Sequence, residues 1–407
     1  MVKVVVIGAG ASGMMCAAIA AKNGADVLLL ERNDRCGRKL GITGKGRCNV
    51  TNACSRDEFL KNVVNNPRFL YSALSAFSTE DTVSFFESLG VPLKVERGNR
   101  VFPVSDKASD IVSALRGCCI ETGVKLQKGL VTEILTQDSA VVGVRLSDGV
   151  VISCDKVCIA CGGMSYPVTG SDGNGYSLAE ACGHEVVSPR PSLVPWETEE
   201  LEFCRSLQGL SLKNTALRVE QNGKTVFSDF GEMMFTHFGV TGPMILTAST
   251  VLQRGMKLHL DLKPALTEEQ LDKRLLSDFE KYRMKNLANA FDDLLPSKLI
   301  LPFLSLCGLD PTAKVHSITK EQRKTILRNL KDLTLTARSS RSIAEAIVTA
   351  GGVKVSKVDP RTMASKLCRG LYFCGEVLDV DAYTGGFNLQ IAFSTGYLAG
   401  LALAESR

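Results

Sequence analysis

The chain has 407 residues, of which 45% are apolar and 22% are charged, and its formal net charge is +5. This composition is typical of a globular protein, excludes an intrinsically disordered chain, and leaves room for two or three domains with large cores. The charge is small and spread along the chain, so by itself it indicates neither a nucleic-acid nor a membrane partner.

The N-terminus has the order strand, helix, strand. Residues 2–7 form an apolar run typical of a buried strand, and the alanine-rich residues 11–23 predict a helix. Residues 25–30 predict a second strand that ends at Glu31. The first run is too short for a signal peptide and leads into a glycine turn, and no other window holds the roughly 20 uninterrupted apolar residues of a membrane helix. We therefore expect a cytoplasmic protein that does not insert into a membrane.

The middle of the chain changes character near residue 190. Before that point helix and strand patterns alternate, with helices expected at 80–89 and 106–122 and strands near 124–135, 140–147 and 150–161. Three prolines, Pro189, Pro191 and Pro195, then precede the only tryptophan, Trp196, and mark a domain boundary. Strand-like alternation dominates residues 196–265. A capping box at Thr267 opens a charged helical stretch.

After residue 346 the pattern returns to strand and helix, at 370–375 and 389–405. The sequence thus predicts an α/β fold class in which a discontinuous, Rossmann-like dinucleotide-binding domain takes in residues 1–190 and 346–407. A β-rich insertion domain covers residues 191–266 and 331–345, and it carries a helical subdomain at 267–330.

The first turn carries the motif Gly8-Ala-Gly10-Ala-Ser-Gly13 between a strand and a helix. In this context Gly8 allows the tight turn, Gly10 lets a pyrophosphate approach the backbone, and Gly13 brings helix and strand together. The helix N-terminus, with Ala11 and Ser12, supplies amide donors. Glu31 is placed to accept hydrogen bonds from ribose hydroxyls. An acid there favours FAD or NAD over NADP.

Residues 32–52 combine many glycines with basic side chains, among them Arg38, Lys39, Lys45 and Arg47. Glycines beside cations are what close approach of a flat, anionic cofactor needs, although a solvated basic loop is an alternative. The segment is not a phosphate-binding P-loop, because Gly46 follows Lys45 and no glycine stands five residues before Gly44.

Longer motifs resemble one family. The stretch Gly44-Lys-Gly-Arg-Cys-Asn-Val-Thr-Asn52 is similar to a signature of the BaiN-like, or aminoacetone oxidase family, flavoproteins, which share the glutathione-reductase-type FAD fold. The motifs around 157–175, 235–243, 349–353 and 374–381 fit the same family, so the resemblance covers nearly the whole chain. It implies a discontinuous Rossmann-like FAD-binding domain with a β-rich insertion.

The resemblance also implies where FAD binds. The turn at Cys161 would back the adenine side, although a cysteine stands where such folds usually have threonine. Gly375 and Glu376 would close against the ribityl and pyrophosphate, and the helix N-terminus at Gly385 would face the flavin pyrimidine edge, where its dipole stabilises reduced flavin. The full set of expected FAD residues is Gly8, Gly10, Ala11, Ser12, Gly13, Glu31, Arg32, Arg38, Lys39, Gly44, Arg47, Cys48, Asn49, Val131, Cys161, Gly162, Gly163, Gly375, Glu376, Gly385, Gly386, Phe387, Asn388 and Leu389.

The fourteen cysteines give little sign of their own chemistry. We expect most of them to be free, buried thiols, because no secretory signal accompanies them. Cys158 and Cys161 would point to opposite faces of a strand, and Cys48 and Cys54 would project to different sides of a helix, which argues against a redox dithiol. We predict no metal site.

There is no second G-x-G-x-x-G unit, so a dedicated NAD(P)H domain is not expected. Hydride or electron exchange between flavin N5 and a small organic substrate remains, with NADH or NADPH as a transient reductant at the same face. One branch of the resembled family reduces conjugated double bonds of 3-oxo bile acids. His237 and Tyr383 are candidate proton donors, and either could instead be structural.

Two other functions stay open. A flavin-dependent RNA-modifying enzyme could present the basic run 32–47 to RNA, and a flavin-binding sensor or electron-transfer module would have no substrate of its own. We favour a small-molecule substrate and no nucleic-acid partner. The sequence has no signature of oligomeric state.

Overall fold

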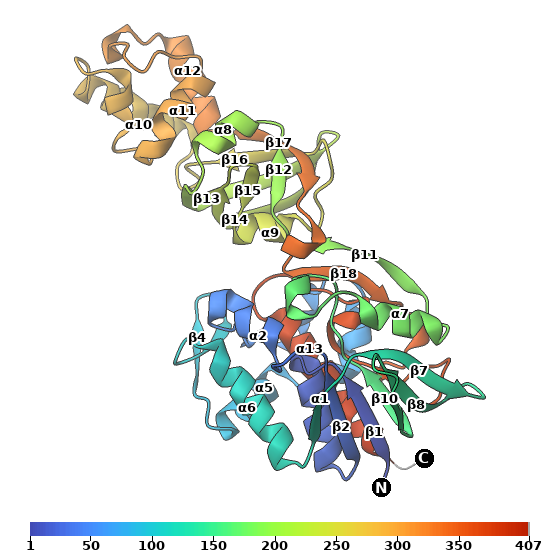
Figure 1. Cartoon of the computed structure of the whole chain (residues 1–407). Helices are drawn as coiled ribbons and strands as arrows, with labels where there is room; N and C mark the ends of the chain where they lie inside the picture. Colours follow the sequence, from blue (N-terminus) through green and yellow to red (C-terminus); the bar gives the residue numbers. More distant parts are fainter. Residues whose placement is uncertain (406–407) are drawn as a thin grey trace. The chain divides into compact units, whose positions relative to one another are not determined.

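The computed structural model describes residues 1–405 and divides the chain into two compact units (Figure 1). Unit 1 joins residues 1–192 to the segment that begins at Ile343, and unit 2 is Leu193–Ser342. The divisions predicted from the sequence were at 190 and 346. The helices of residues 268–331 belong to unit 2.

Unit 1 is built on a parallel five-stranded sheet of order β19-β10-β1-β2-β6. The central strand β1 is buried over Val4–Ile7, as expected of a strand covered on both faces. The outer strand β19 comes from the C-terminal segment, which makes the unit discontinuous. The bounds are β1 (Lys3–Ile7), β2 (Asp26–Glu31), β6 (Lys125–Lys128), β10 (Lys156–Ile159) and β19 (Leu371–Phe373).

Helices α1 (Ala11–Lys22) and α13 (Phe387–Ala404) pack closely in unit 1. A Cβ on Gly396 would lie 2.5 Å from the carbonyl oxygen of Ser12, and one on Gly400 would lie 2.7 Å from that of Cys16. Glycine lets the two backbones approach this far. Helix α13 has a mean hydropathy of 1.2 and the length of a membrane span, but 67% of it is buried in the protein. Such burial is typical of a core helix.

The other elements of unit 1 surround this core (Figure 1). Its antiparallel sheets have the orders β3-β5-β4, β7-β8-β9 and β11-β18. The strands are β3 (Thr51–Asn52), β4 (Leu93–Glu96), β5 (Arg100–Pro103), β7 (Val131–Gln137), β8 (Ala140–Leu146), β9 (Val151–Ser153), β11 (Val186–Ser192) and β18 (Val348–Val353). The helices are α2 (Arg38–Ile42), α3 (Arg56–Lys61), α4 (Tyr71–Ala76), α5 (Thr79–Ser88), α6 (Ala108–Glu121) and α7 (Asn174–Ala181).

Two predicted strands were wrong in the same way. The strand expected at 124–135 is two strands, because the chain leaves the parallel sheet after β6 and enters an antiparallel sheet at β7. The strand expected at 150–161 likewise divides into β9 and β10, where the backbone amide of Lys3 donates to the Asp155 carboxylate. Apolar alternation does not reveal which sheet a strand joins.

Unit 2 contains a closed barrel of order β12-β15-β14-β13-β16-β17. Its interior is apolar, with Leu217, Leu258 and Leu335 at most 2% exposed. The strands are β12 (Trp196–Thr198), β13 (Ser211–Gln221), β14 (Lys224–Phe235), β15 (Gly239–Thr241), β16 (Lys257–Asp261) and β17 (Leu333–Ser340). Two short helices, α8 (Leu201–Ser206) and α9 (Pro243–Ala248), interrupt the stretch predicted to be mostly strand.

A helical insert enters the barrel sequence between β16 and β17. Its helices are α10 (Glu268–Lys281), α11 (Ser297–Leu306) and α12 (Lys320–Lys331), with short 3-10 turns η4 (Leu287–Phe291) and η5 (Val315–Ser317). The predicted capping box is confirmed, because the Thr267 side chain accepts from the Gln270 amide and the Gln270 side chain accepts from the Thr267 amide. Thr319 caps α12 in the same way with Gln322.

Candidate active site

The glycines of the β1–α1 turn have three different environments. Gly8 has a φ of +102°, and a Cβ there would lie 2.7 Å from the carbonyl oxygen of Ala160. A Cβ on Gly13 would lie only 1.8 Å from the carbonyl oxygen of Gly8. A Cβ on Gly10 would meet no atom within 4 Å. Two glycines therefore pack the turn, and Gly10 leaves open space beside the backbone.

The N-terminus of α1 is available for an anion. Gly10 is its N-cap, no side chain caps it, and its first turn, which includes Ala11 and Ser12, contains no acidic residue. The free amides and the helix dipole favour a phosphate at this position. The Ser12 hydroxyl instead faces the C-terminal segment, at 3.5 Å from the carbonyl oxygen of Cys374.

Glu31 ends β2 beside this turn. Its carboxylate accepts hydrogen bonds from the amides of Ala9 and Asn33, both at 2.9 Å, and from the Asn33 side chain at 2.7 Å. Asn33 also donates to the carbonyl oxygen of Thr169, and Arg38 donates to the Asn33 side chain at 2.8 Å. These bonds hold the carboxylate close to the glycine turn, where a nucleotide ribose would lie.

We expect Glu31→Arg to lower the amount of FAD that co-purifies by at least about tenfold, since a cation would replace the acceptor that the ribose hydroxyls need. The ratio of flavin to protein absorbance measures this directly. Glu31→Gln, which keeps an acceptor oxygen, is the matched control and should retain more flavin. Full flavin content in Glu31→Arg would show that the nucleotide lies elsewhere.

A second cluster joins α2 to the C-terminal segment. The ammonium of Lys39 donates to the Glu376 carboxylate at 2.7 Å and to the Ser165 hydroxyl at 2.6 Å. Glu376 lies in the 3-10 turn η8 (Gly375–Val377) and also accepts from Ser165 at 3.1 Å and from the Thr349 amide at 2.8 Å. The Lys39 and Glu376 side chains are only 22% and 20% exposed. Segments far apart in sequence therefore meet here.

The other cations of residues 32–52 are largely used inside the protein. Arg32 pairs with Asp172. The Arg47 guanidinium pairs with Glu96 and Asp106 and lies 4.2 Å from the centre of the Phe102 ring. The hydrogen bond from Arg47 lowers the pKa of the Glu96 carboxyl below its usual value. Hydrogen bonds from Lys94 and then from Arg47 lower the pKa of the Asp106 carboxyl in the same way. Ion pairs with other segments therefore hold Arg32 and Arg47 in place, which a solvated basic loop would not show.

Cys48 and Asn49 follow the glycine-rich turn η1 (Thr43–Gly46), in which Gly44 has a φ of +57°. Cys48 is fully buried with a φ of +60°, and burial raises the pKa of its thiol to about 12. The side-chain oxygen of Asn49 is buried and accepts no hydrogen bond from the described residues. A buried acceptor without a donor implies that a further group, such as a bound cofactor, satisfies it.

Helix α13 presents its N-terminus from the loop at Gly385 and Gly386. A Cβ on Gly386 would lie 2.3 Å from the carbonyl oxygen of Thr51, and φ there is +100°. No side chain caps the helix, so the amides of its first residues, Phe387 to Leu389, are free of a cap. The Asn388 side chain braces the loop instead, because it donates to the carbonyl oxygen of Ala382 at 2.7 Å and accepts from the Ala382 amide at 3.0 Å.

The β10–α7 turn completes the carboxyl edge of the sheet. The Cys161 thiol lies 3.5 Å from the carbonyl oxygen of Ile7. Gly162 has a φ of +73°, and a Cβ on Gly163 would lie 2.5 Å from the Thr349 hydroxyl. Val131, at the start of β7, accepts through its carbonyl from the Asn174 side chain at 3.0 Å. Four of the residues predicted to bind FAD, Gly8, Glu31, Cys161 and Gly375, thus end or closely follow strands at the carboxyl edge of the parallel sheet.

These features fit FAD. The open space at Gly10, two uncapped helix N-termini and the buried Asn49 oxygen are what a pyrophosphate and a flavin ring would use. The sequence of the chain matches the family model named HI0933-like protein Rossmann domain over residues 2–402. The chain belongs to the HI0933-like family. The predicted fold class is confirmed, and the protein is an FAD-dependent oxidoreductase with a Rossmann-type FAD-binding domain.

The similarity to curated HI0933-like relatives runs over the full length. The chain is 32% identical to the 3-dehydro-bile acid delta(4,6)-reductase of Clostridium scindens, over 98% of both chains. It is 31% identical to the ribosomal RNA dihydrouridine synthase of Escherichia coli, over 97% of this chain and 96% of that one. The predicted resemblance to BaiN-like flavoproteins is thereby confirmed.

Among solved structures, the 3-ketosteroid-delta4-(5alpha)-dehydrogenase of Rhodococcus jostii matches with a TM-score of 0.52 at 15% identity, covering 100% of this chain and 97% of that one. The 3-ketosteroid delta1-dehydrogenase of Sterolibacterium denitrificans has the same TM-score at 14% identity, covering 99% and 100% of the two chains. At these identities the likeness concerns the fold alone.

The two candidate proton donors of this HI0933-like protein lie in different units. Tyr383 is in the unit 1 loop before α13, where its amide donates to the carbonyl oxygen of Asn62 at 2.9 Å. His237 is exposed in the unit 2 turn between β14 and β15, with its ring 5.0 Å from that of Phe238. The expected FAD residues all belong to unit 1. Tyr383 is therefore the candidate that shares a unit with them, and His237 is not.

Sequence reasoning missed a buried carboxyl beside Tyr383. Asp381 is 1% exposed and accepts from the Asn65 side chain and from the Ser192 hydroxyl, the latter at 2.9 Å. Burial raises its pKa above the usual aspartate value. The residue ends the motif at 374–381, so its presence was visible, but its burial was not. Ser165 and Thr349, which bind Glu376, were missed for the same reason.

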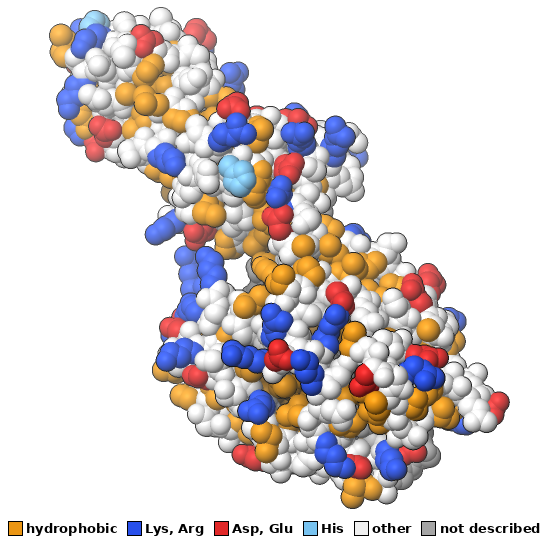
Figure 2. All heavy atoms as spheres, in the orientation of Figure 1, with side chains coloured by type: hydrophobic (Ala, Val, Ile, Leu, Met, Phe, Trp, Pro, Cys, Tyr) orange, Lys and Arg blue, Asp and Glu red, His pale blue; other side chains and the backbone are white. Residues whose placement is uncertain are grey.

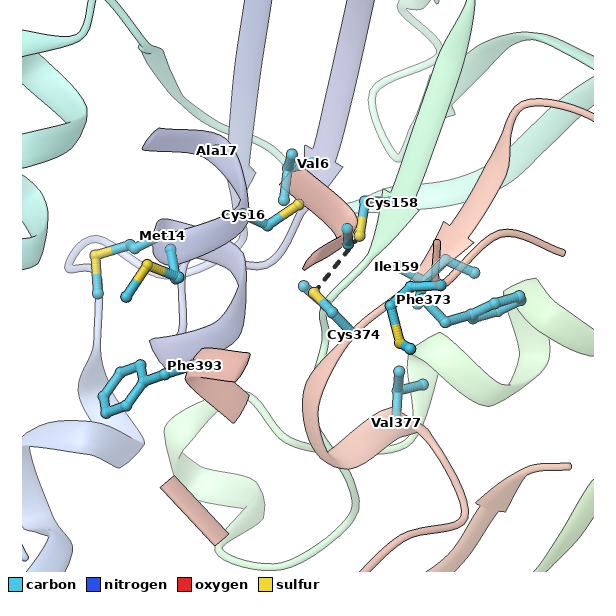
Figure 3. Packing of buried hydrophobic residues seen from close by; sticks show 14 of the residues in the cluster. Val6, Met14, Cys16, Ala17, Cys158, Ile159, Phe373, Cys374, Val377 and Phe393 are labelled. Carbon is cyan, nitrogen blue, oxygen red and sulfur yellow. Dashed lines mark hydrogen bonds between the residues drawn. The ribbon is translucent and has the colours of Figure 1, made fainter. Parts of the chain in front are cut away.

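The cysteines of this HI0933-like protein are free thiols, as predicted. Cys158 does not face Cys161. Its sulfur lies 3.5 Å from that of Cys374, and Cys16 on α1 completes a group whose sulfurs lie within 4.8 Å of one another (Figure 3). All three side chains are fully buried among apolar residues. The expectation that Cys48 and Cys54 occupy a helix was wrong, because both lie outside the helices around them.

Proposed function

We propose that the protein reduces a carbon–carbon double bond conjugated to a carbonyl group, with NADH or NADPH supplying the two electrons. The observation that carries the proposal is full-length similarity to relatives whose names share this chemistry. A delta(4,6)-reductase of a 3-dehydro-bile acid reduces carbon–carbon double bonds near a ketone. A dihydrouridine synthase saturates the pyrimidine bond that is conjugated to a ring carbonyl.

Bound FAD would supply hydride-transfer chemistry at the carbon remote from the carbonyl. The chain's residues would do the rest. Gly10 and the N-terminus of α1 would hold the pyrophosphate, and Glu31 would hold the ribose. The uncapped N-terminus of α13 would stabilise negative charge at the pyrimidine edge of the cofactor. An acid must also protonate the carbon next to the carbonyl, and Tyr383 is our first candidate for it.

Two substrate classes are compatible with this reaction. The first is a small 3-oxo enone such as a bile acid or a steroid. The second is a uridine in ribosomal RNA, which the relatives at 31% identity favour and which the basic surface described below supports. A cytoplasmic enzyme stays our prediction for both classes, whereas the prediction of no nucleic-acid partner holds only for the first. A sensor without a substrate is the remaining alternative.

The test is an anaerobic titration of the purified holoenzyme followed by its visible spectrum. We expect NADH or NADPH to bleach the flavin bands and an enone such as a 3-oxo-4-ene steroid, or an unmodified ribosomal RNA transcript, to restore them. The compound that restores the bands identifies the substrate class. Flavin that is reduced but is reoxidised by neither compound would contradict the proposal and favour an oxidase or a sensor.

A further inference from the structure

The helical insert of unit 2 carries a group of exposed cations that the site in unit 1 does not use. We name it the basic tip and define it by Lys281, Arg283, Lys285, Lys314 and His316, all of which are exposed. The first three follow one another at alternate positions where α10 ends, and the other two lie in and just before η5. Lys and Arg side chains, in blue, are visible on the surface of the insert in Figure 2.

Backbone hydrogen bonds hold the two segments of the basic tip side by side. The amide of His316 donates to the carbonyl oxygen of Arg283, and the amide of Val315 donates to that of Lys285, both at 3.2 Å. Asn286 and Lys314 form an isolated β-bridge, and the Lys314 ammonium reaches the Asn286 side chain at 3.0 Å. The cations thus belong to one continuous surface and not to two unrelated loops.

Few carboxylates neutralise this surface. Lys281 pairs with Asp293 at 3.0 Å, and Arg283 has only a long contact of 3.8 Å to the highly exposed Glu280. Lys285 lies 4.8 Å from the centre of the Tyr282 ring, and neither it nor Lys314 has a carboxylate partner among residues 1–405.

An apolar side chain stands among these cations. Met284, between Arg283 and Lys285, is 73% exposed.

The basic run 32–47, which the sequence offered as an RNA-facing surface, behaves differently. Arg32, Lys39 and Arg47 each pair with a carboxylate within unit 1. The carboxylates neutralise these three cations, which are also among the residues expected to bind FAD. The basic tip, in contrast, presents clustered exposed cations with few carboxylate partners, and phosphates could displace water and counterions there.

We propose that the basic tip binds the sugar–phosphate backbone of RNA and positions it for the enzyme. This inference rests on the second substrate class of the proposed function, a uridine in ribosomal RNA. Its cations supply electrostatic contacts that are independent of base sequence, while recognition of the reacting base would belong to the site in unit 1. The occupant is a polyanionic nucleic acid and not a small molecule, because the five cations are all exposed and spread over two segments of the insert.

The experiment compares RNA binding by the full-length holoenzyme and by the triple variant Arg283→Ala, Lys285→Ala, Lys314→Ala. The probe is an unmodified ribosomal RNA transcript, measured by filter binding between about 50 and 200 mM salt. We expect the variant to bind at least about tenfold more weakly at the lower salt, and the slope of log K against log salt to fall by about 2 to 3. Its flavin spectrum and its bleaching by NADH or NADPH should match the wild type.

The matched control is the pair Lys213→Ala and Lys224→Ala, exposed lysines of the barrel strands outside the basic tip. Its RNA affinity should stay within about twofold of the wild type. Equal losses in the control and the tip variant, unchanged binding in the tip variant, or equally tight binding of the wild type to anionic lipid vesicles would each overturn the proposal. The binding assay requires no turnover. RNA binding at the basic tip can therefore be judged even if the flavin titration shows that the protein does not reduce a conjugated double bond.

Discussion

Gly10→Val is expected to abolish FAD binding while leaving the fold intact. The new side chain would meet no protein atom within 4 Å of its Cβ, and the backbone of Gly10 has a φ of −82°, which any residue adopts. The same open space is where a pyrophosphate must approach the amides of α1. We expect the affinity for FAD to fall at least about a hundredfold, or ~2.7 kcal/mol. Titration of the apoprotein with FAD, followed by flavin fluorescence, measures the loss.

The matched control for this variant is Gly117→Val in α6, since a Cβ on Gly117 also meets nothing within 4 Å but lies in a helix away from the turn. Both apoproteins should have far-ultraviolet circular dichroism like that of the wild type, and only Gly10→Val should lose FAD. If Gly10→Val binds FAD as tightly as the wild type, the open space at the turn is not the pyrophosphate site.

Gly13→Ala is expected to have the largest effect on stability of any single methyl addition to the glycine turn. The added Cβ would lie 1.8 Å from the carbonyl oxygen of Gly8 and 3.2 Å from the Ala160 side chain. The first of these is rigid backbone, so α1 must move away from β1. We expect a loss of about 3 kcal/mol or more in the free energy of unfolding, far beyond the gain of ~1 kcal/mol that alanine brings to a helix.

This loss should be measured on apoproteins, because bound FAD stabilises the native state by itself and would hide or exaggerate the difference. Gly41→Ala in α2 is the control, as a Cβ there meets nothing within 4 Å. We expect the unfolding midpoint of Gly41→Ala to stay close to that of the wild type. A Gly13→Ala apoprotein with an unchanged midpoint would contradict the close helix–strand contact.

The contrast between Gly10 and Gly13 shows what a motif does and does not say. The pattern predicted three roles, and the structure assigns packing to Gly8 and Gly13 and open space to Gly10. This agreement arises because a strand, a tight turn and a helix in sequence leave the backbone few alternatives. The limits of α1 and β2 were likewise predicted to within a residue or two, since the glycine turn opens α1 and Glu31 ends β2.

The partners of the cysteines and of the basic run 32–47 could not be predicted from local sequence patterns. The spacing correctly argued against pairing Cys158 with Cys161, but it did not reveal that the sulfur of Cys158 meets that of Cys374, which is 216 positions away in sequence. The run 32–47 had the composition of a solvated or ligand-facing loop, but its carboxylate partners, such as Asp172, Glu96 and Glu376, come from distant segments. No local pattern encodes such pairings.

By itself, the sequence determined the glycine turn, the acid at the end of β2, the capping box at Thr267 and the return of the chain to the first domain. Each depends on a few neighbouring residues or on a period of two or 3.6 residues, which act before any long-range contact forms. The tertiary structure alone decided that Lys39 meets Glu376, that Asp381 is buried, and that two segments of the insert form one basic surface. These outcomes depend on which distant segments pack together, and packing follows from the burial of the whole chain rather than from any one stretch of it.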